Sequence, residues 1–177
     1  IKSTEPKNKG YTNGSFIIQY QDDNPKKISL EYGTQRKTRS DCPYNPDETT
    51  QTCLFNVDVS PYNNQPLNYR FTIEDIANQT DESKSLVIYA DTIAPTINNI
   101  GYSLDKSRVK FNITISEPVE LEYYDHNENR PKWKSLCSNC AEYIKTKSFS
   151  KGVHNLSIRA TDNVYHTGLR QAYFNST

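Results

Sequence analysis

The sequence predicts an all-β protein that consists of two antiparallel β-sandwiches in tandem. Short runs in which apolar and polar residues alternate recur along the chain, and clusters of turn residues separate them. Few windows show the 3.6-residue apolar period of a helix. The chain also resembles itself, because residues 53–80 align without gaps on residues 140–167. Many short strands within each half are typical of a sandwich.

Each half is expected to contain five or six strands whose alternate residues face a core. In the first half we expect strands at residues 15–21, 27–33, 53–59, 68–74 and 83–90. In the second half we expect strands at residues 96–103, 108–116, 119–125, 143–149, 155–161 and 167–174. In the run 155–161, Leu156, Ile158 and Ala160 share one face. A shift of one residue would bury the polar face instead, so this register should be firmly fixed.

The internal similarity also covers the front of each half, which indicates a duplicated module. Leu30-Glu31-Tyr32 recurs as Leu121-Glu122-Tyr123. The other landmarks that recur in the same order are Phe16, Ile18 and Tyr20 with Val109, Phe111 and Ile113, Cys53 with Cys140, Val57 with Ile144, and Asp75 with Asp162. At the junction, Pro95 favours extended backbone at Ala94. We therefore expect one module at residues 1–91 and a second at residues 92–177.

The four cysteines form one pair in each module, and both pairs are expected at the same point of the repeat. Four cysteines allow three pairings. The repeat favours Cys42 with Cys53 and Cys137 with Cys140, because each bond then closes a loop inside one module. A redox-active Cys-x-x-Cys motif would need a strand followed by a helix, and a zinc site would need all four thiolates to converge. Structural disulfides are favoured over both alternatives, and they imply an oxidising compartment.

Five Asn-x-Ser/Thr triplets mark potential N-glycosylation sites, at Asn13, Asn78, Asn112, Asn155 and Asn175. A chain this rich in Asn, Ser and Thr contains some such triplets by chance, so the triplets alone are a weak signal. Together with the cysteines they favour an extracellular glycoprotein. Asn112 and Asn155 lie on expected polar strand faces, and glycans there would keep those faces from packing.

Charge and composition exclude several functional classes. Lys and Arg total 21, as do Asp and Glu, so the formal net charge is zero and nucleic acid is not an expected partner. No apolar run approaches the roughly 20 residues that span a bilayer. The chain contains no methionine and opens at Ile1. We therefore expect a processed protein or a piece of a longer one.

No residue pattern points to catalysis, and we expect neither enzymatic activity nor a cofactor. No nucleophile elbow, phosphate-binding loop or zinc-protease motif is present. The histidines lack metal-ligand spacing and are expected at the surface; they are His126, His154 and His166. Glu117, Glu120 and Glu122 lie close together, but alternation puts only the last two on one solvent face. A solvated charged face is therefore expected rather than an acid–base pair.

Three ligand hypotheses stay open beside this expectation. Calcium would prefer clustered carboxylates, and the candidates at loop ends are Asp75, Asp91 and Asp162, although no dense acidic motif supports a metal site. The basic run at residues 36–39 is either an anionic-glycan site or a charge-balanced loop. Trp133 is expected to be an edge or loop aromatic that covers the core, and stacking on a sugar is the alternative role.

Two stretches resemble a known group of proteins. Residues 89–97, YADTIAPTI, are similar to the junction between tandem immunoglobulin-like domains of prokaryotic surface proteins. Residues 151–163, KGVHNLSIRATDN, resemble the late strand pair of those domains, although the Gly-Asn that often follows the Asp in that family is absent. The cysteine loop resembles a variant found in archaeal cell-surface proteins. The resemblance implies immunoglobulin-like or fibronectin III-like sandwiches in an adhesin, S-layer or filament component, with no catalytic residue.

The leading functional hypothesis is a non-enzymatic pair of modules from an extracellular cell-surface, S-layer or filament protein. Such modules serve spacing, assembly or adhesion, and their expected partners are neighbouring domains or like subunits, with glycans as a further option. One alternative is a carbohydrate-binding module that uses Trp133 and loop tyrosines. The other is an accessory module of a larger secreted enzyme.

Overall fold

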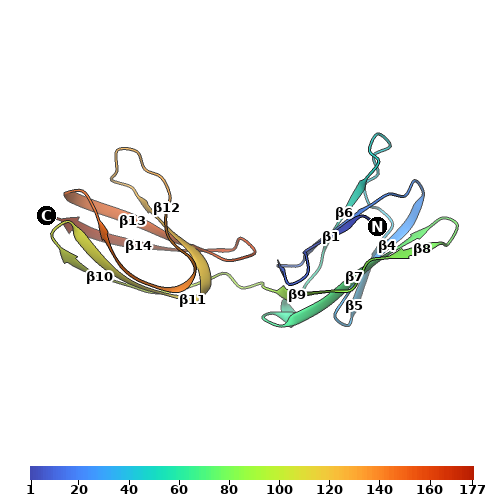
Figure 1. Cartoon of the computed structure of the whole chain (residues 1–177), viewed down its shortest axis with the longest axis horizontal. Coiled ribbons are helices and arrows are strands. Elements are labelled where there is room, and N and C mark those ends of the chain that lie inside the picture. Colours follow the sequence, from blue (N-terminus) through green and yellow to red (C-terminus); the bar gives the residue numbers. More distant parts are fainter. The chain divides into compact units, whose positions relative to one another are not determined.

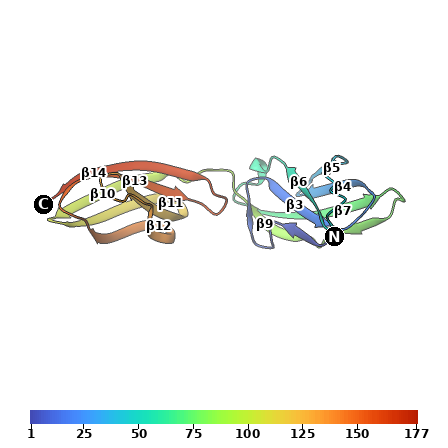
Figure 2. The same cartoon turned by 90° about the horizontal axis from the view of Figure 1, so that it is seen from above.

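The computed structural model describes all residues from 1 to 177, and its regular structure is β-strand apart from one short 3-10 turn (Figures 1 and 2). The chain divides into two compact units, Ile1–Thr92 and Ile93–Thr177, and each unit encloses its own hydrophobic core. The expected all-β fold is confirmed. No helix of the chain is long and apolar enough to cross a bilayer.

Unit 1 is a sandwich of a three-stranded and a six-stranded sheet. Its elements are β1 (Ser3–Glu5), β2 (Tyr11–Thr12), β3 (Ser15–Tyr20), β4 (Pro25–Tyr32), β5 (Gln35–Arg39), β6 (Gln51–Asn56), η1 (Ser60–Tyr62), β7 (Pro66–Asp75), β8 (Thr80–Glu82) and β9 (Leu86–Ala90). The smaller sheet has the order β1-β3-β6, and the larger has the order β2-β9-β7-β4-β5 with β8 on β7. All pairs are antiparallel except β2 with β9.

The core of unit 1 forms because alternate residues of β7 point between its sheets. Tyr69 and Phe71 are buried there, and their rings meet those of Phe16 and Phe55 edge to face at centroid distances of 5.0 and 5.4 Å. Burial raises the pKa of Tyr69, whose hydroxyl donates to Thr4 at 3.1 Å. The many aromatic side chains of unit 1 therefore serve to fill a thin core.

Unit 2 contains fewer and longer strands. They are β10 (Ile97–Asp105), β11 (Arg108–Asp125), β12 (Lys134–Ser148), β13 (Gly152–Thr161) and β14 (Thr167–Ser176). The first part of β11 pairs with β10 and with the end of β12, whereas its second part pairs with β13 and with the start of β12. β11 and β12 thus each contribute to both layers of the sandwich.

The expected break at residues 117–118 is wrong, because β11 continues through it as one strand. The pairing of β11 with β12 shifts register between Thr114 and Val119. A β-bulge of this kind bends a strand without ending it. Pro118 interrupts the apolar alternation, which is why the sequence suggested two strands at residues 108–116 and 119–125.

The strands that the sequence analysis did not find are short or polar. β1, β2 and β8 have at most three residues, and β5 is a mostly exposed strand of polar and basic residues. The first part of β12 was missed for the same reason, since its residues are exposed or half-buried. Such segments carry no apolar alternation, so periodicity cannot reveal them.

Both units contain the same turn after one of their inner strands, β7 in unit 1 and β13 in unit 2. The Asp75 carboxylate accepts the amide of Gln79 at 2.8 Å, and the Asp162 carboxylate accepts the amide of His166 at 2.9 Å. Each turn also holds one residue in the left-handed region, with φ of 62° in the first and 67° in the second. This equivalence agrees with the ungapped part of the sequence repeat.

The two disulfides lie at different places in their units, so the expectation of equivalent positions is wrong. Cys42 is bonded to Cys53, which is fully buried in β6 opposite Ile18 of β3. Cys137 is bonded to Cys140 in the start of β12, where Cys140 lies opposite Val119. The first disulfide therefore belongs to the core and the second braces an edge strand.

We predict that Phe71→Ala lowers the free energy of unfolding of unit 1 by about 3–5 kcal/mol, because it leaves a cavity in a fully packed core. Leu54 of β6 is 42% exposed, and Leu54→Ala serves as the control, with an expected change within about 0.5 kcal/mol. Thermal unfolding followed by near-ultraviolet circular dichroism measures both changes. Equal losses for the two variants would contradict the assignment of Phe71 to the core.

Candidate functional site

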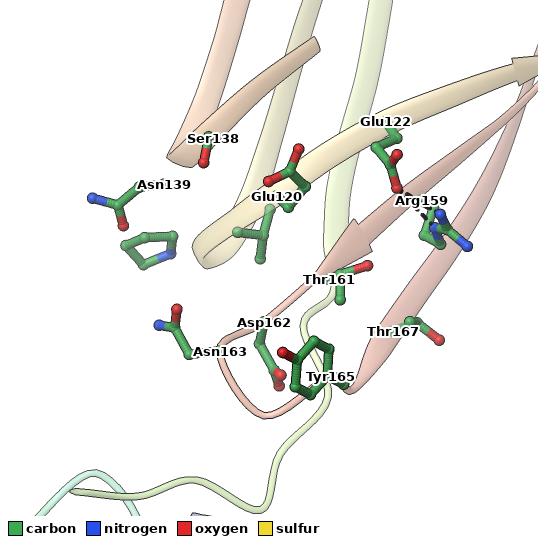
Figure 3. A pocket seen from close by; sticks show the side chains of 12 residues that line it. Glu120, Glu122, Ser138, Asn139, Arg159, Thr161, Asp162, Asn163, Tyr165 and Thr167 are labelled. Atoms are coloured by element: carbon green, nitrogen blue, oxygen red, sulfur yellow. Dashed lines mark hydrogen bonds and ion pairs between the residues drawn. The ribbon is translucent and has the colours of Figure 1, made fainter. Parts of the chain in front are cut away.

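A hollow of about 640 Å³ lies at the surface of unit 2. Figure 3 shows the side chains around it, which come from β11, β12, β13, the turn before β14 and the first residue of β14. The labelled lining residues are Glu120, Glu122, Ser138, Asn139, Arg159, Thr161, Asp162, Asn163, Tyr165 and Thr167. The bulge in β11 and the Cys137–Cys140 disulfide shape the same end of the sandwich.

The only cation of the hollow is already paired. Arg159 donates from Nε and Nη2 to Glu122 Oε2 at 3.1 and 2.6 Å, and Figure 3 marks this contact. Its guanidinium carbon also lies 4.0 Å from the ring centroid of Trp133. Arg159 is thus held between a carboxylate and an indole, an arrangement that fixes its planar group.

Trp133 lies on the outer surface of unit 2, and the expectation that it covers the core is wrong. Its half-buried ring packs 5.5 Å from that of Tyr124, whose neighbours along β11, Tyr123 and Asp125, are buried. The guanidinium of Arg159 covers one face of the indole. That face is closed to a sugar, which weakens the alternative role of Trp133 as a stacking platform.

The remaining lining of the hollow supplies hydrogen-bonding groups. Ser138 and Asn139 offer a hydroxyl and an amide, and the exposed Glu120 carboxylate accepts one long bond of 3.4 Å from Ser135. Tyr165 is 86% exposed and holds a φ of 67°. An aromatic residue is uncommon in that conformation, and the equivalent position of unit 1 holds Asn78.

His154 is buried, so the expectation of three surface histidines is wrong for this residue. Its Nδ1 lies 2.5 Å from Asp125 Oδ2 and its Nε2 lies 2.8 Å from the Ser150 carbonyl oxygen. Its ring also packs against Phe149 and Phe174. His126 is exposed beside Ser157, and His166 is half-buried against Asp162. The buried pair joins β11 to β13 inside an apolar core.

The other residues considered from the sequence have mainly structural contacts. The carboxylates of Asp75 and Asp162 bind amides of their own turns, and Asp91 is buried. The basic run is engaged as well, since Lys37 and Arg39 donate to backbone carbonyls of β6. This arrangement favours the structural interpretation of that run over an anionic-glycan site.

The glycosylation triplets occupy accessible positions. Four of the asparagines are exposed and Asn155 is half-buried. The exposed four are Asn13, Asn78, Asn112 and Asn175. Asn78 accepts a hydrogen bond of 2.6 Å from Lys26. Asn112 and Asn155 alternate with buried neighbours along their strands, so they do lie on the outer faces.

We predict that Arg159→Ala moves the fluorescence emission of Trp133, the only tryptophan, to longer wavelength, because water replaces the guanidinium on the indole. Arg70 of unit 1 is the matched control. It donates to Glu31 at 2.6 Å and thereby lowers the pKa of Glu31, but it contacts no tryptophan. Arg70→Ala should leave the emission unchanged. An unchanged spectrum for Arg159→Ala would refute the stacked arrangement.

We also predict that Asp125→Ala destabilises unit 2 by about 3–5 kcal/mol, because it leaves the buried His154 without its partner. The double variant Asp125→Leu/His154→Leu should cost less than the single change, since it removes both polar groups. Asp105→Ala, at an exposed position, is the control. Chemical denaturation measures the free energy of unfolding of all three variants. An Asp125→Ala variant as stable as the wild type would show that the pair does not support the core.

Comparisons with known proteins identify the fold. No protein-family model and no curated protein matches the chain. Among solved structures it is similar to fibronectin(III)-like modules of Clostridium thermocellum CbhA, with 14% identity, a TM-score of 0.51, and coverage of 97% of this chain and 90% of that one. It is also similar to the FN1–FN3 domains of chicken CNTN1, with 11% identity and a TM-score of 0.57. This match covers 99% of this chain and 63% of the chicken chain. The chain therefore has the fold of tandem fibronectin III-like sandwiches.

Proposed function

We propose that the chain is a non-enzymatic pair of duplicated modules, residues 1–91 and 92–177, in an extracellular cell-surface, S-layer or filament protein. The observation that carries this proposal is that each unit closes its own core and holds its own disulfide. A module of that kind keeps its shape without a partner. It can therefore space or present contact surfaces along a longer protein.

The disulfides support an oxidising location. The Cys42–Cys53 bond spans 11 residues of sequence, and closing such a loop stabilises a fold by about 3 kcal/mol. Structural disulfides persist outside the cytosol, where thiols are not kept reduced. We propose glycans on the accessible triplets of both units, because an extracellular route would expose these asparagines to modification.

The expected partners are neighbouring domains or like subunits, and loops and strand edges supply the contacts. Carbohydrate binding is the second candidate function, and the exposed ring of Tyr165 beside the polar hollow is the observation that favours it. If the hollow binds sugars, Tyr165→Ala should abolish binding on a glycan array. Trp133→Ala should then have a smaller effect, because one face of its ring is covered.

The proposal is tested on the mature protein isolated from its source cells. We predict that peptide mapping under non-reducing conditions finds both disulfides and no free thiol. At least one glycosylation triplet should carry glycan, and a membrane-impermeant amine reagent should label the protein on intact cells. Free thiols together with labelling only after lysis would overturn the extracellular assignment.

A further inference from the structure

Large apolar side chains are exposed on the outer strand faces of unit 2. They are Ile144, Val153, Leu169 and Tyr173. Three of them lie directly opposite the asparagine of an Asn-x-Ser/Thr triplet, in the pairs Ile144–Asn112, Val153–Asn175 and Tyr173–Asn155. Residues opposite each other on neighbouring strands share one face of the sheet. A sugar on each of these asparagines would therefore begin beside an exposed apolar side chain.

Unit 1 covers most of its comparable side chains with protein. The ring of Tyr89 packs 5.7 Å from that of Tyr11, and Leu54 of β6 lies opposite Ile17 of β3. Val87, also exposed, has no triplet asparagine opposite it. Both triplet asparagines of this unit lie between strands. The pairing of an exposed apolar side chain with a triplet asparagine is thus confined to unit 2.

Asn155 of β13 and Tyr173 of β14 form the closest kind of cross-strand pair. The Asn155 backbone amide donates to Asn127 Oδ1 at 3.0 Å, and its carbonyl accepts the His126 amide at 2.9 Å. The Tyr173 carbonyl accepts the Tyr102 hydroxyl of β10 at 2.5 Å. The backbone groups of both residues thus point away from each other's strand. In such a non-hydrogen-bonded pair the Cα atoms lie about 4.5 Å apart and the side chains approach closely.

Both side chains of this pair are available. Asn155 enters hydrogen bonds through its backbone alone, and the side chain of Tyr173 is largely exposed, at 62%. The neighbouring pair on the core side, His154 and Phe174, is buried with its rings stacked 5.2 Å apart. The packed neighbours fix the backbone of Asn155 and Tyr173. The asparagine and the phenol ring are therefore presented side by side on a rigid surface.

We propose that N-linked glycans on Asn112, Asn155 and Asn175 cover the outer faces of unit 2, and that the innermost sugar on Asn155 packs on the ring of Tyr173. The inference rests on the extracellular route proposed above, which supplies the glycans. It adds the site at which a glycan becomes part of the packed structure. The occupant is identified by the triplets themselves, because each places its asparagine directly opposite the exposed side chain.

The contact suits the chemistry of both partners. One face of a pyranose ring presents mainly C–H groups, whereas its hydroxyl groups project outward to water. Covering a tyrosine ring with that face removes apolar surface from water on both sides. Such a contact exists only in the folded chain, since it needs the register of β13 and β14. The glycan should therefore stabilise unit 2.

The test uses the full chain secreted from a eukaryotic host, which attaches glycans through N-acetylglucosamine. Peptide mass mapping should find Asn155 occupied. Trp133, the only tryptophan, reports the chemical unfolding of unit 2. Loss of the glycan through Asn155→Gln should lower the folding equilibrium constant by about five- to tenfold. Trimming to the innermost sugar should preserve most of that stabilisation. In a Tyr173→Ser background, Asn155→Gln should have almost no effect.

Leu169→Ser is the matched control. Leu169 is as exposed as Tyr173 and lies on the same face of β14, but it is opposite Arg159. The effect of Asn155→Gln should therefore persist in the Leu169→Ser background. Chains made without glycans should show no coupling between positions 155 and 173.

Three results would overturn the inference: an unoccupied Asn155, an equal effect of Asn155→Gln with Tyr173 and with Ser at position 173, or loss of the stabilisation on trimming. These results are distinct from failure of the proposed function. Free thiols in the native protein would reject the extracellular assignment without changing the coupling measured on the secreted chain. An occupied Asn155 without coupling would reject only the contact with Tyr173.

Discussion

The burial of one apolar face from each sheet against its partner sheet is the constraint on which the structure depends. β7 and β13 show it most clearly, since their alternate residues are buried along nearly the whole strand. The chain has a modest apolar fraction of 34%, so each unit fills its core with aromatic rings and β-branched side chains. The turns, disulfides and surface pairs are arranged around these two cores.

Alternation and turn residues were sufficient to predict the fold class and most of the strands, because those signals report directly on which face is buried. These signals could not determine which residues lie opposite each other on neighbouring strands. Each unit sets a Glu opposite an Arg of the neighbouring strand, Glu31 with Arg70 and Glu122 with Arg159, yet Arg70 precedes Asp75 by five residues and Arg159 precedes Asp162 by three. The ungapped repeat places Arg159 on Thr72. A slip of two residues keeps every side chain on its face, so periodicity does not detect it.

The candidate site was harder to predict than the fold. The sequence singled out Trp133, but the hollow depends on a bulge in β11 and on the turn at Asp162, which unite residues far apart in the chain. His154 and Asp125 occupy core-facing positions where alternation suggested apolar residues, and only their hydrogen bond explains their burial. Both features rest on contacts between strands, which a single sequence does not encode locally.

Hydrogen–deuterium exchange on the intact chain tests the central claim most directly, namely that each unit closes a separate core. Ile158 is fully buried in β13, and Ile158→Ala removes packing from unit 2 alone. The account predicts faster exchange across residues 93–177 and unchanged protection in β3, β4 and β7. Loss of protection in both units to the same extent would show one shared core and contradict the account.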